Sequence, residues 1–154
     1  MASHTWLATT DCSVSHCSST NTFAKDSSTS YVQSSTTAEQ GYGDEDMVVS
    51  GPLVTDQICL FANTTFCTES TFEFIGVSQV EEMTIPVQYG VIGLSPQGTS
   101  KFVESLAAYT EDVPYKIFTI RMFSQNTGSY IEFGRPDDEN SYYTYGSTSY
   151  AWAQ

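Results

Sequence analysis

Carboxylates are the side chains most able to do chemistry in this chain of 154 residues, which has 18 acidic and only five basic side chains. Six of them stand in two runs of three, Asp44-Glu45-Asp46 and Asp137-Asp138-Glu139. Neither run has the Asp-x-Asp-x-Asp-Gly spacing of a calcium-binding loop. Each follows a glycine or a proline, where Asp favours turns, so we expect two solvated loops and no metal there.

Nucleophilic catalysis by serine would need a positioned histidine, and the chain has only His4 and His16. Both lie in a front section rich in Ser and Thr, without the strand-turn-helix context of a hydrolase nucleophile. The sequence also lacks a phosphate-binding loop and a dinucleotide fingerprint. We therefore expect no cofactor.

Four cysteines occur as two local pairs, Cys12 with Cys17 and Cys59 with Cys67. Four cysteines allow three disulfide connectivities, and the sequence alone does not choose among them. Local pairing is the economical choice because each pair brackets a loop rich in Ser, Thr or Asn. The alternative is a metal site made by Cys12, His16 and Cys17, which would need a fourth ligand such as His4.

The compartment is indicated by two opposing observations. Paired cysteines and the glycosylation sequon Asn63-Thr64-Thr65 suit the secretory pathway. After Met1, however, the chain has no basic and then apolar stretch, so we recognise no signal peptide, and no segment is apolar enough to span a membrane. The chain is then either cytosolic with free thiols or a piece of a longer secreted protein.

The formal charge of -13 argues against nucleic acids and anionic membranes as partners, because phosphate would repel the chain. This excess of acidic residues also suits a protein that works at low pH, where many carboxylates are protonated and repel one another less.

Short strands and one helix are the elements that must position any site. Alternating and β-branched residues predict strands, which we place as a hairpin and following strand over residues 36–61, then at 71–80, 116–123, 129–134 and in the tail at 142–152. Helical spacing of apolar residues predicts a helix over 100–109. Between them, Gly90 and Gly93 frame a short apolar run, where missing side chains would let another backbone approach closely. The pattern predicts an all-β barrel or sandwich.

A series of short motifs follows a definite order along the chain. They are Trp6 before Cys12 and Cys17, Phe23 with Asp26-Ser27-Ser28-Thr29, Tyr42-Gly43, Ile75-Gly76-Val77-Ser78, Gly90-Val91-Ile92-Gly93-Leu94, Phe118-Thr119-Ile120, Gly128 to Gly134, and Tyr142 to Gly146. Their order and spacing resemble the N-terminal lobe of pepsin-like aspartic endopeptidases over nearly the whole chain.

The resemblance implies an all-β acid-protease lobe, a distorted β-barrel with one short helix. Residues 1–154 would form a single, incomplete N-terminal lobe without its C-terminal lobe. Tyr42 and Gly43 would belong to the flap over a polypeptide substrate, supported by Trp6. The active-site scaffold beside the catalytic-aspartate loop would be formed by Gly90, Val91, Ile92 and Gly93. Asn63 would be a glycosylation site.

The catalytic motif of the family is the largest departure. Two Asp-Thr/Ser-Gly carboxylates, one from each lobe, share a proton and activate water, and this sequence contains neither. Alignment at Trp6 places the first Asp just before Met1, and the second belongs to a lobe beyond Gln154. The flap also carries Asp44-Glu45-Asp46 where the family has Thr and Gly, and Tyr89 replaces an Asp.

The chain as written is therefore expected to be an inactive one-lobe fragment of an aspartic endopeptidase, with the missing C-terminal lobe as its partner. The alternative is a non-catalytic lobe that binds peptides or proteins. The resemblance places the parent protein outside the cell or in a lysosome or vacuole. Without a second lobe, the chain should expose apolar surface.

Overall fold

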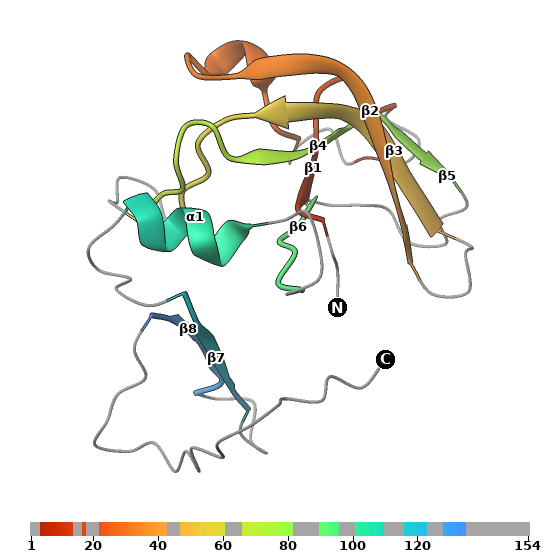
Figure 1. The fold of residues 1–154 in the computed structure, drawn as a ribbon. Helices are drawn as coiled ribbons and strands as arrows, with labels where there is room; N and C mark the ends of the chain where they lie inside the picture. The colour runs from red at the N-terminus through yellow and green to blue at the C-terminus, as the bar shows by residue number, and fades with distance from the viewer. Residues whose placement is uncertain are drawn as a thin grey trace.

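The computed structural model describes residues 4–13, 17, 22–42, 47–60, 66–81, 90–95, 101–109, 116–122 and 128–134. The elements in chain order are β1 (Trp6–Ala8), the 3-10 helix η1 (Lys25–Ser27), β2 (Val32–Tyr42), β3 (Met47–Thr55), β4 (Glu73–Val77), β5 (Gln79–Glu81), β6 (Gly90–Val91), α1 (Phe102–Tyr109), β7 (Phe118–Arg121) and β8 (Tyr130–Phe133) (Figure 1). The predicted all-β class with one short helix is confirmed in this part of the chain.

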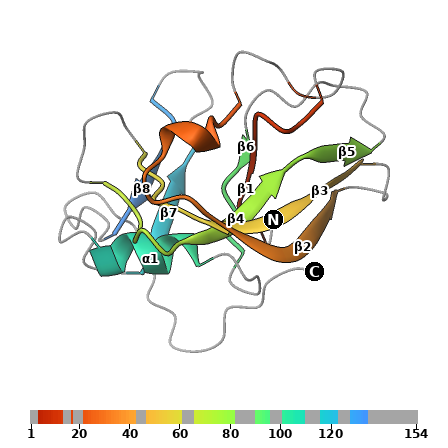
Figure 2. The same ribbon diagram turned by 90° about the horizontal axis from the view of Figure 1, so that it is seen from above.

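The larger sheet has the strand order β2-β3-β4-β1-β6, and β5 pairs with β3 beside this path. Strand β1 is parallel to β4 and antiparallel to β6, with Trp6 opposite Ile75 and Val91. Seen from above, β1 and β6 lie side by side (Figure 2). Among the described strands the path is open between β2 and β6, so these strands do not close a barrel.

Two clusters of buried side chains form the core. The first holds Trp6, Ala8, Cys12, Cys17, Val49, Ile75, Val77 and Val80. The second holds Val54, Phe72, Phe74, Phe102 and Leu106. Helix α1 joins the second cluster through Phe102 and Leu106, which are one helical turn apart and so share a face. The ring of Phe102 contacts Phe72 on one side and Phe133 of β8 on the other, at centroid distances of 5.7 Å and 5.9 Å.

The strand predicted to follow the hairpin and end at residue 61 is wrong at its C-terminal end, because β3 stops at Thr55. The next residue, Asp56, is buried, and its Oδ1 accepts hydrogen bonds from the Gln57 backbone N–H and the Ser30 hydroxyl. An Asp side chain that bonds the following backbone competes with strand pairing. At the other end, β2 begins at Val32, so the hairpin starts earlier than predicted.

Both local cysteine pairs are disulfides, Cys12–Cys17 and Cys59–Cys67. A metal site built on Cys12, His16 and Cys17 is therefore excluded, because metals are bound by thiolates and these sulfurs are bonded to each other. His16 itself lies outside the described residues, as do the tail at 142–152 and the turn that joins β2 to β3.

Candidate functional site

Trp6 and Tyr42 form the centre of the candidate site. Trp6 belongs to strand β1, which lies between β4 and β6, and is only 3% exposed, whereas Tyr42 is the last residue of β2. The Trp6 Nε1–H donates a hydrogen bond of 2.5 Å to the Tyr42 hydroxyl oxygen. The two rings meet edge to face at a centroid distance of 6.4 Å. The end of β2 is thereby held against strand β1.

The Tyr42 hydroxyl is suited to hydrogen bonding rather than to acid–base work. Burial raises its pKa above the usual tyrosine value, and the hydrogen bond from Trp6 opposes this shift only in part. The phenol therefore stays neutral at any physiological pH. Since its oxygen already accepts from Trp6, its O–H remains able to donate to another acceptor, such as a peptide carbonyl.

His4 and Gln40 make a second link between the same two segments. Gln40 Oε1 lies 2.9 Å from His4 Nδ1, and Gln40 Nε2 donates to the Gly41 carbonyl at 2.7 Å. The sequence reasoning missed this pair. Its signal was the two-residue spacing of Gln40 and Tyr42, which places both on one face of β2.

Gly90 and Gly93 pack directly onto the backbone that leads into β1. A Cβ atom at Gly90 would lie 2.4 Å from the Trp6 carbonyl oxygen, and one at Gly93 would lie 2.7 Å from the His4 carbonyl carbon. Side-chain carbons do not approach backbone atoms so closely, so glycine is needed at both positions. The Gly93 N–H also donates to the buried Thr5 hydroxyl at 3.0 Å. The close backbone approach that the sequence indicated is therefore present.

The predicted site residues thus converge on residues 4–7. Trp6 bonds Tyr42, Val91 pairs with Trp6, and Gly90 and Gly93 touch the adjoining backbone, while Ile92 lies 36% exposed beside them. Gly43, Tyr89, Asn63 and the acidic run after Gly43 lie outside the described residues, so their predicted roles stay predictions.

The described residues of the candidate site include no carboxylate, and His4 is their one ionisable side chain besides Tyr42. None of residues 4–7, 40–42 and 90–93 is an Asp or a Glu. Within the described ranges, no three His, Cys, Asp or Glu side chains are grouped as a metal site would require. No helix in those ranges is both long and apolar enough to cross a membrane.

Comparison with known proteins agrees with this geometry. No curated protein matches the chain. The family of eukaryotic aspartyl proteases matches residues 2–151. Because this match covers nearly all of the 154 residues, the chain belongs to the eukaryotic aspartyl protease family.

Proposed function

We propose that the chain is the N-terminal lobe of an aspartic endopeptidase and that its candidate site positions a polypeptide for cleavage. The observation that carries this proposal is the hydrogen bond from Trp6 to Tyr42. It fixes the phenol at the end of the β2–β3 hairpin with its O–H still able to donate. In this proposal Tyr42 and Gly43 are the flap, Trp6 supports it, and the run from Gly90 to Gly93 supports the adjoining catalytic loop.

The reaction of this class needs two carboxylates close together, because their mutual repulsion leaves one protonated as the acid and the other ionised as the base. None of the 154 residues belongs to an Asp-Thr-Gly or Asp-Ser-Gly motif. We therefore expect these 154 residues alone to hydrolyse no peptide bond. Both carboxylates would come from polypeptide outside this sequence, including a C-terminal lobe.

The β7–β8 hairpin supports the need for further polypeptide. Ile120, Met122 and Ile131 are 53%, 85% and 51% exposed. Neighbouring apolar side chains that are exposed together commonly mark a surface that another chain or lobe covers. A C-terminal lobe is one polypeptide that would do so.

A second candidate function is a non-catalytic lobe that binds peptides. It is favoured by two observations at the site: Trp6 and Tyr42 are in contact, and residues 4–7, 40–42 and 90–93 include no carboxylate. For either function, two disulfides favour a secretory compartment, with the extracellular space, lysosome or vacuole as the destination.

The transcript on both sides of this sequence separates the two candidates. An in-frame Asp-Thr-Gly or Asp-Ser-Gly before Met1, with a second copy after Gln154, is the result expected for a peptidase. Stop codons on both sides would contradict it and leave the binding lobe. In parallel, cleavage of an unfolded protein by the purified 154-residue chain at acidic pH would contradict the expected inactivity.

Peptide binding tests the role given to Tyr42 in both candidates. Replacing Tyr42 with Phe removes the O–H donor and should weaken binding by about two- to tenfold, the value of one hydrogen bond. Tyr31→Phe is the matched control, because the Tyr31 hydroxyl bonds Gln33 and does not touch Trp6. Equal affinities of the wild type and Tyr42→Phe would argue against the flap assignment.

A further inference from the structure

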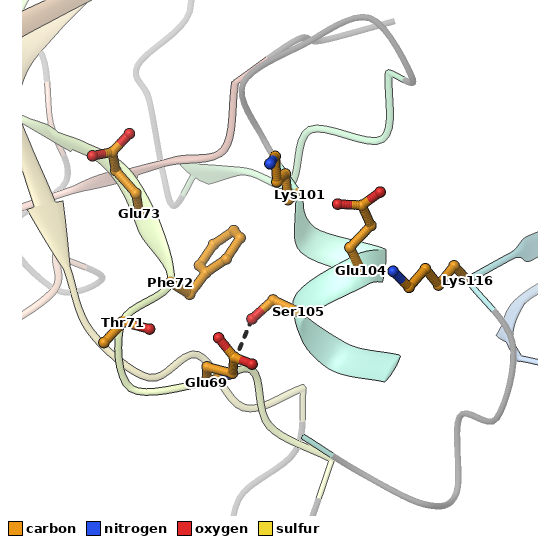
Figure 3. Close-up of a pocket in the computed structure, with 8 residues that line it drawn as sticks. All are labelled: Glu69, Thr71, Phe72, Glu73, Lys101, Glu104, Ser105 and Lys116. Atoms are coloured by element: carbon orange, nitrogen blue, oxygen red, sulfur yellow. Dashed lines mark hydrogen bonds between the residues drawn. The ribbon is translucent and has the colours of Figure 1, made fainter. Parts of the chain in front are cut away.

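A pocket of about 490 Å³ lies away from the Trp6–Tyr42 pair, where three segments of the chain converge. Its walls come from the residues leading into β4, from helix α1 and from the start of the β7 segment (Figure 3). The lining residues are Glu69, Thr71, Phe72, Glu73, Lys101, Glu104, Ser105 and Lys116. The volume falls in the range of about 300–1,000 Å³ that is usual for ligand sites.

The pocket is held open by contacts between its walls. The Glu69 backbone N–H donates to the Ser105 hydroxyl at 3.0 Å, which links the β4 side to helix α1. A second contact joins the same two walls, where Phe72 meets Phe102 edge to face. Figure 3 shows the Phe72 ring directed between the two walls, with Glu73 on its strand side and Lys101 on its helix side. A ligand would therefore meet a site whose walls need not be assembled first.

The charges of the pocket are unusual for this chain. Only three lysines occur in the sequence, and two of them, Lys101 and Lys116, line this pocket. Lys25, the third, forms an ion pair with Asp11. In the described part of the chain, neither pocket lysine is within salt-bridge distance of a carboxylate, although three glutamates share the pocket.

This mixture of charges selects the chemistry of the ligand. A polyanion would face three carboxylates, and a polycation would face two ammonium groups, so either would be repelled by part of the wall. A small molecule is also a poor fit, because sites for small molecules are mostly apolar and enclose the ligand, whereas the charged lining residues here are exposed. A polypeptide that carries both an acidic and a basic side chain matches both signs.

We propose that this pocket is an accessory binding site for a polypeptide segment of mixed charge. The lysines would receive its carboxylate and the glutamates its basic side chain. The choice of a polypeptide as ligand rests on the proposed function. The site itself lies outside the flap region, so it would hold a part of the polypeptide other than the one beside Tyr42.

The test uses capped peptides in which one Asp and one Arg are separated by a variable run of apolar residues. Their affinities for the 154-residue chain are measured by fluorescence anisotropy, together with analogues that carry Asn for Asp or citrulline for Arg. Each exposed ion pair is worth about a two- to fivefold change in affinity. The Asp peptide should therefore bind the wild type more tightly than the Asn peptide, and added salt should reduce the difference.

Variants assign this preference to the pocket. Lys101→Gln with Lys116→Gln should abolish the preference for Asp over Asn, and Glu73→Gln should reduce the preference for Arg over citrulline. Lys25→Gln and Glu81→Gln are matched controls, because these exposed or partly exposed residues lie outside the pocket and should change neither preference. The proposal is overturned if no peptide of the series shows saturable binding, if the controls act as the pocket variants do, or if free amino acids compete equally with the peptides.

Tyr42→Phe separates this site from the proposed function. Peptide binding at the pocket should be unaffected by Tyr42→Phe, whereas binding at the flap should be insensitive to the changes at Lys101 and Glu73. Binding that depends on Tyr42 alone would overturn the pocket proposal and support the flap. Binding that depends on the pocket residues alone would support the pocket proposal and argue against the flap.

Discussion

The large sheet and the β7–β8 hairpin use the same kinds of residue with opposite results. In the sheet, Ile75 and Val77 of β4 are 0% exposed. In the hairpin, Ile120 and Ile131 are paired across the strands and share one face, yet each is about half exposed. β-Branched side chains favour strands in both places. The difference therefore arises from what covers each face, not from the residue types.

Polar groups show the same contrast. In the sheet region, the buried Thr9 hydroxyl donates to the Val77 carbonyl at 3.0 Å, and buried Asp56 is bonded by Ser30 and Gln57. In the hairpin, Glu132 Oε2 is buried without a hydrogen-bond donor among the described residues. Buried polar atoms are nearly always hydrogen-bonded, so the hairpin departs from the usual pattern at Glu132, as the sheet region does not at Thr9 and Asp56.

Phe102 is the side chain that joins the two regions, and its removal should have the largest effect. It is 1% exposed and touches both Phe72 and Phe133. We expect Phe102→Ala to lower the free energy of unfolding by about 3–5 kcal/mol, since it leaves a cavity in the core. Denaturant unfolding would measure the loss, and hydrogen exchange should show β7–β8 losing protection before the sheet. Equal loss in both regions would contradict a hairpin that is held mainly by Phe102.

Removal of the Cys59–Cys67 disulfide should act on the sheet region alone. The bond closes a loop with a sequence separation of eight, so Cys59→Ser with Cys67→Ser should cost about 2–3 kcal/mol of stability through the unfolded chain. Thermal unfolding in the oxidised state provides the measurement. Unchanged exchange rates in β7–β8 are expected, and faster exchange there would show that the two regions are more tightly coupled than their contacts indicate.

Part of the fold could be predicted because it depends on local patterns, whereas strand β1 and its pairing with β4 and β6 were not predicted. Alternation identified β4, β7 and β8, helical spacing identified α1, and the spacing of Gly90 and Gly93 identified the close approach to β1. The end of β3 was not predicted, and only the local bond from the Gln57 N–H to Asp56 could have indicated it, because the second bond to Asp56 comes from Ser30, 26 positions away. A pairing of that kind is fixed by the tertiary fold and leaves no periodic signal.

The candidate site was predictable to a similar degree. Its aromatic and glycine residues were found through their order along the chain, whereas the contact of His4 with Gln40 joins residues 36 positions apart and was not foreseen. The exposure of Ile120 and Ile131 is likewise invisible in the sequence, where they look like any other strand residues.

Tyr42→Phe should have a smaller effect on stability and a distinctive pH dependence. Losing the hydrogen bond from Trp6 should cost about 0.5–1.5 kcal/mol. Because burial raises the Tyr42 pKa in the folded state, the folded chain holds this proton more tightly than the unfolded chain does. The resulting stability is fully present below the unfolded value of about 10 and is lost as the pH rises through the folded pKa.

Unfolding free energies of the wild type and Tyr42→Phe, measured from neutral to strongly alkaline pH, test this linkage. The wild type should lose more stability than the variant above pH about 10. Parallel curves would contradict the raised pKa.

Ile120→Thr should have the smallest effect on stability, and it tests the contrast between the regions directly. The side chain is 53% exposed, so the free energy of unfolding should change by no more than about 0.5 kcal/mol. The same substitution at Ile75, which is fully buried, should cost several times more, because it removes apolar contacts and buries a hydroxyl. If the apolar hairpin surface drives association, Ile120→Thr should also reduce self-association of the isolated chain in sedimentation velocity. A large stability loss at Ile120 would show that its face is already covered, and the proposed need for another polypeptide there would fail.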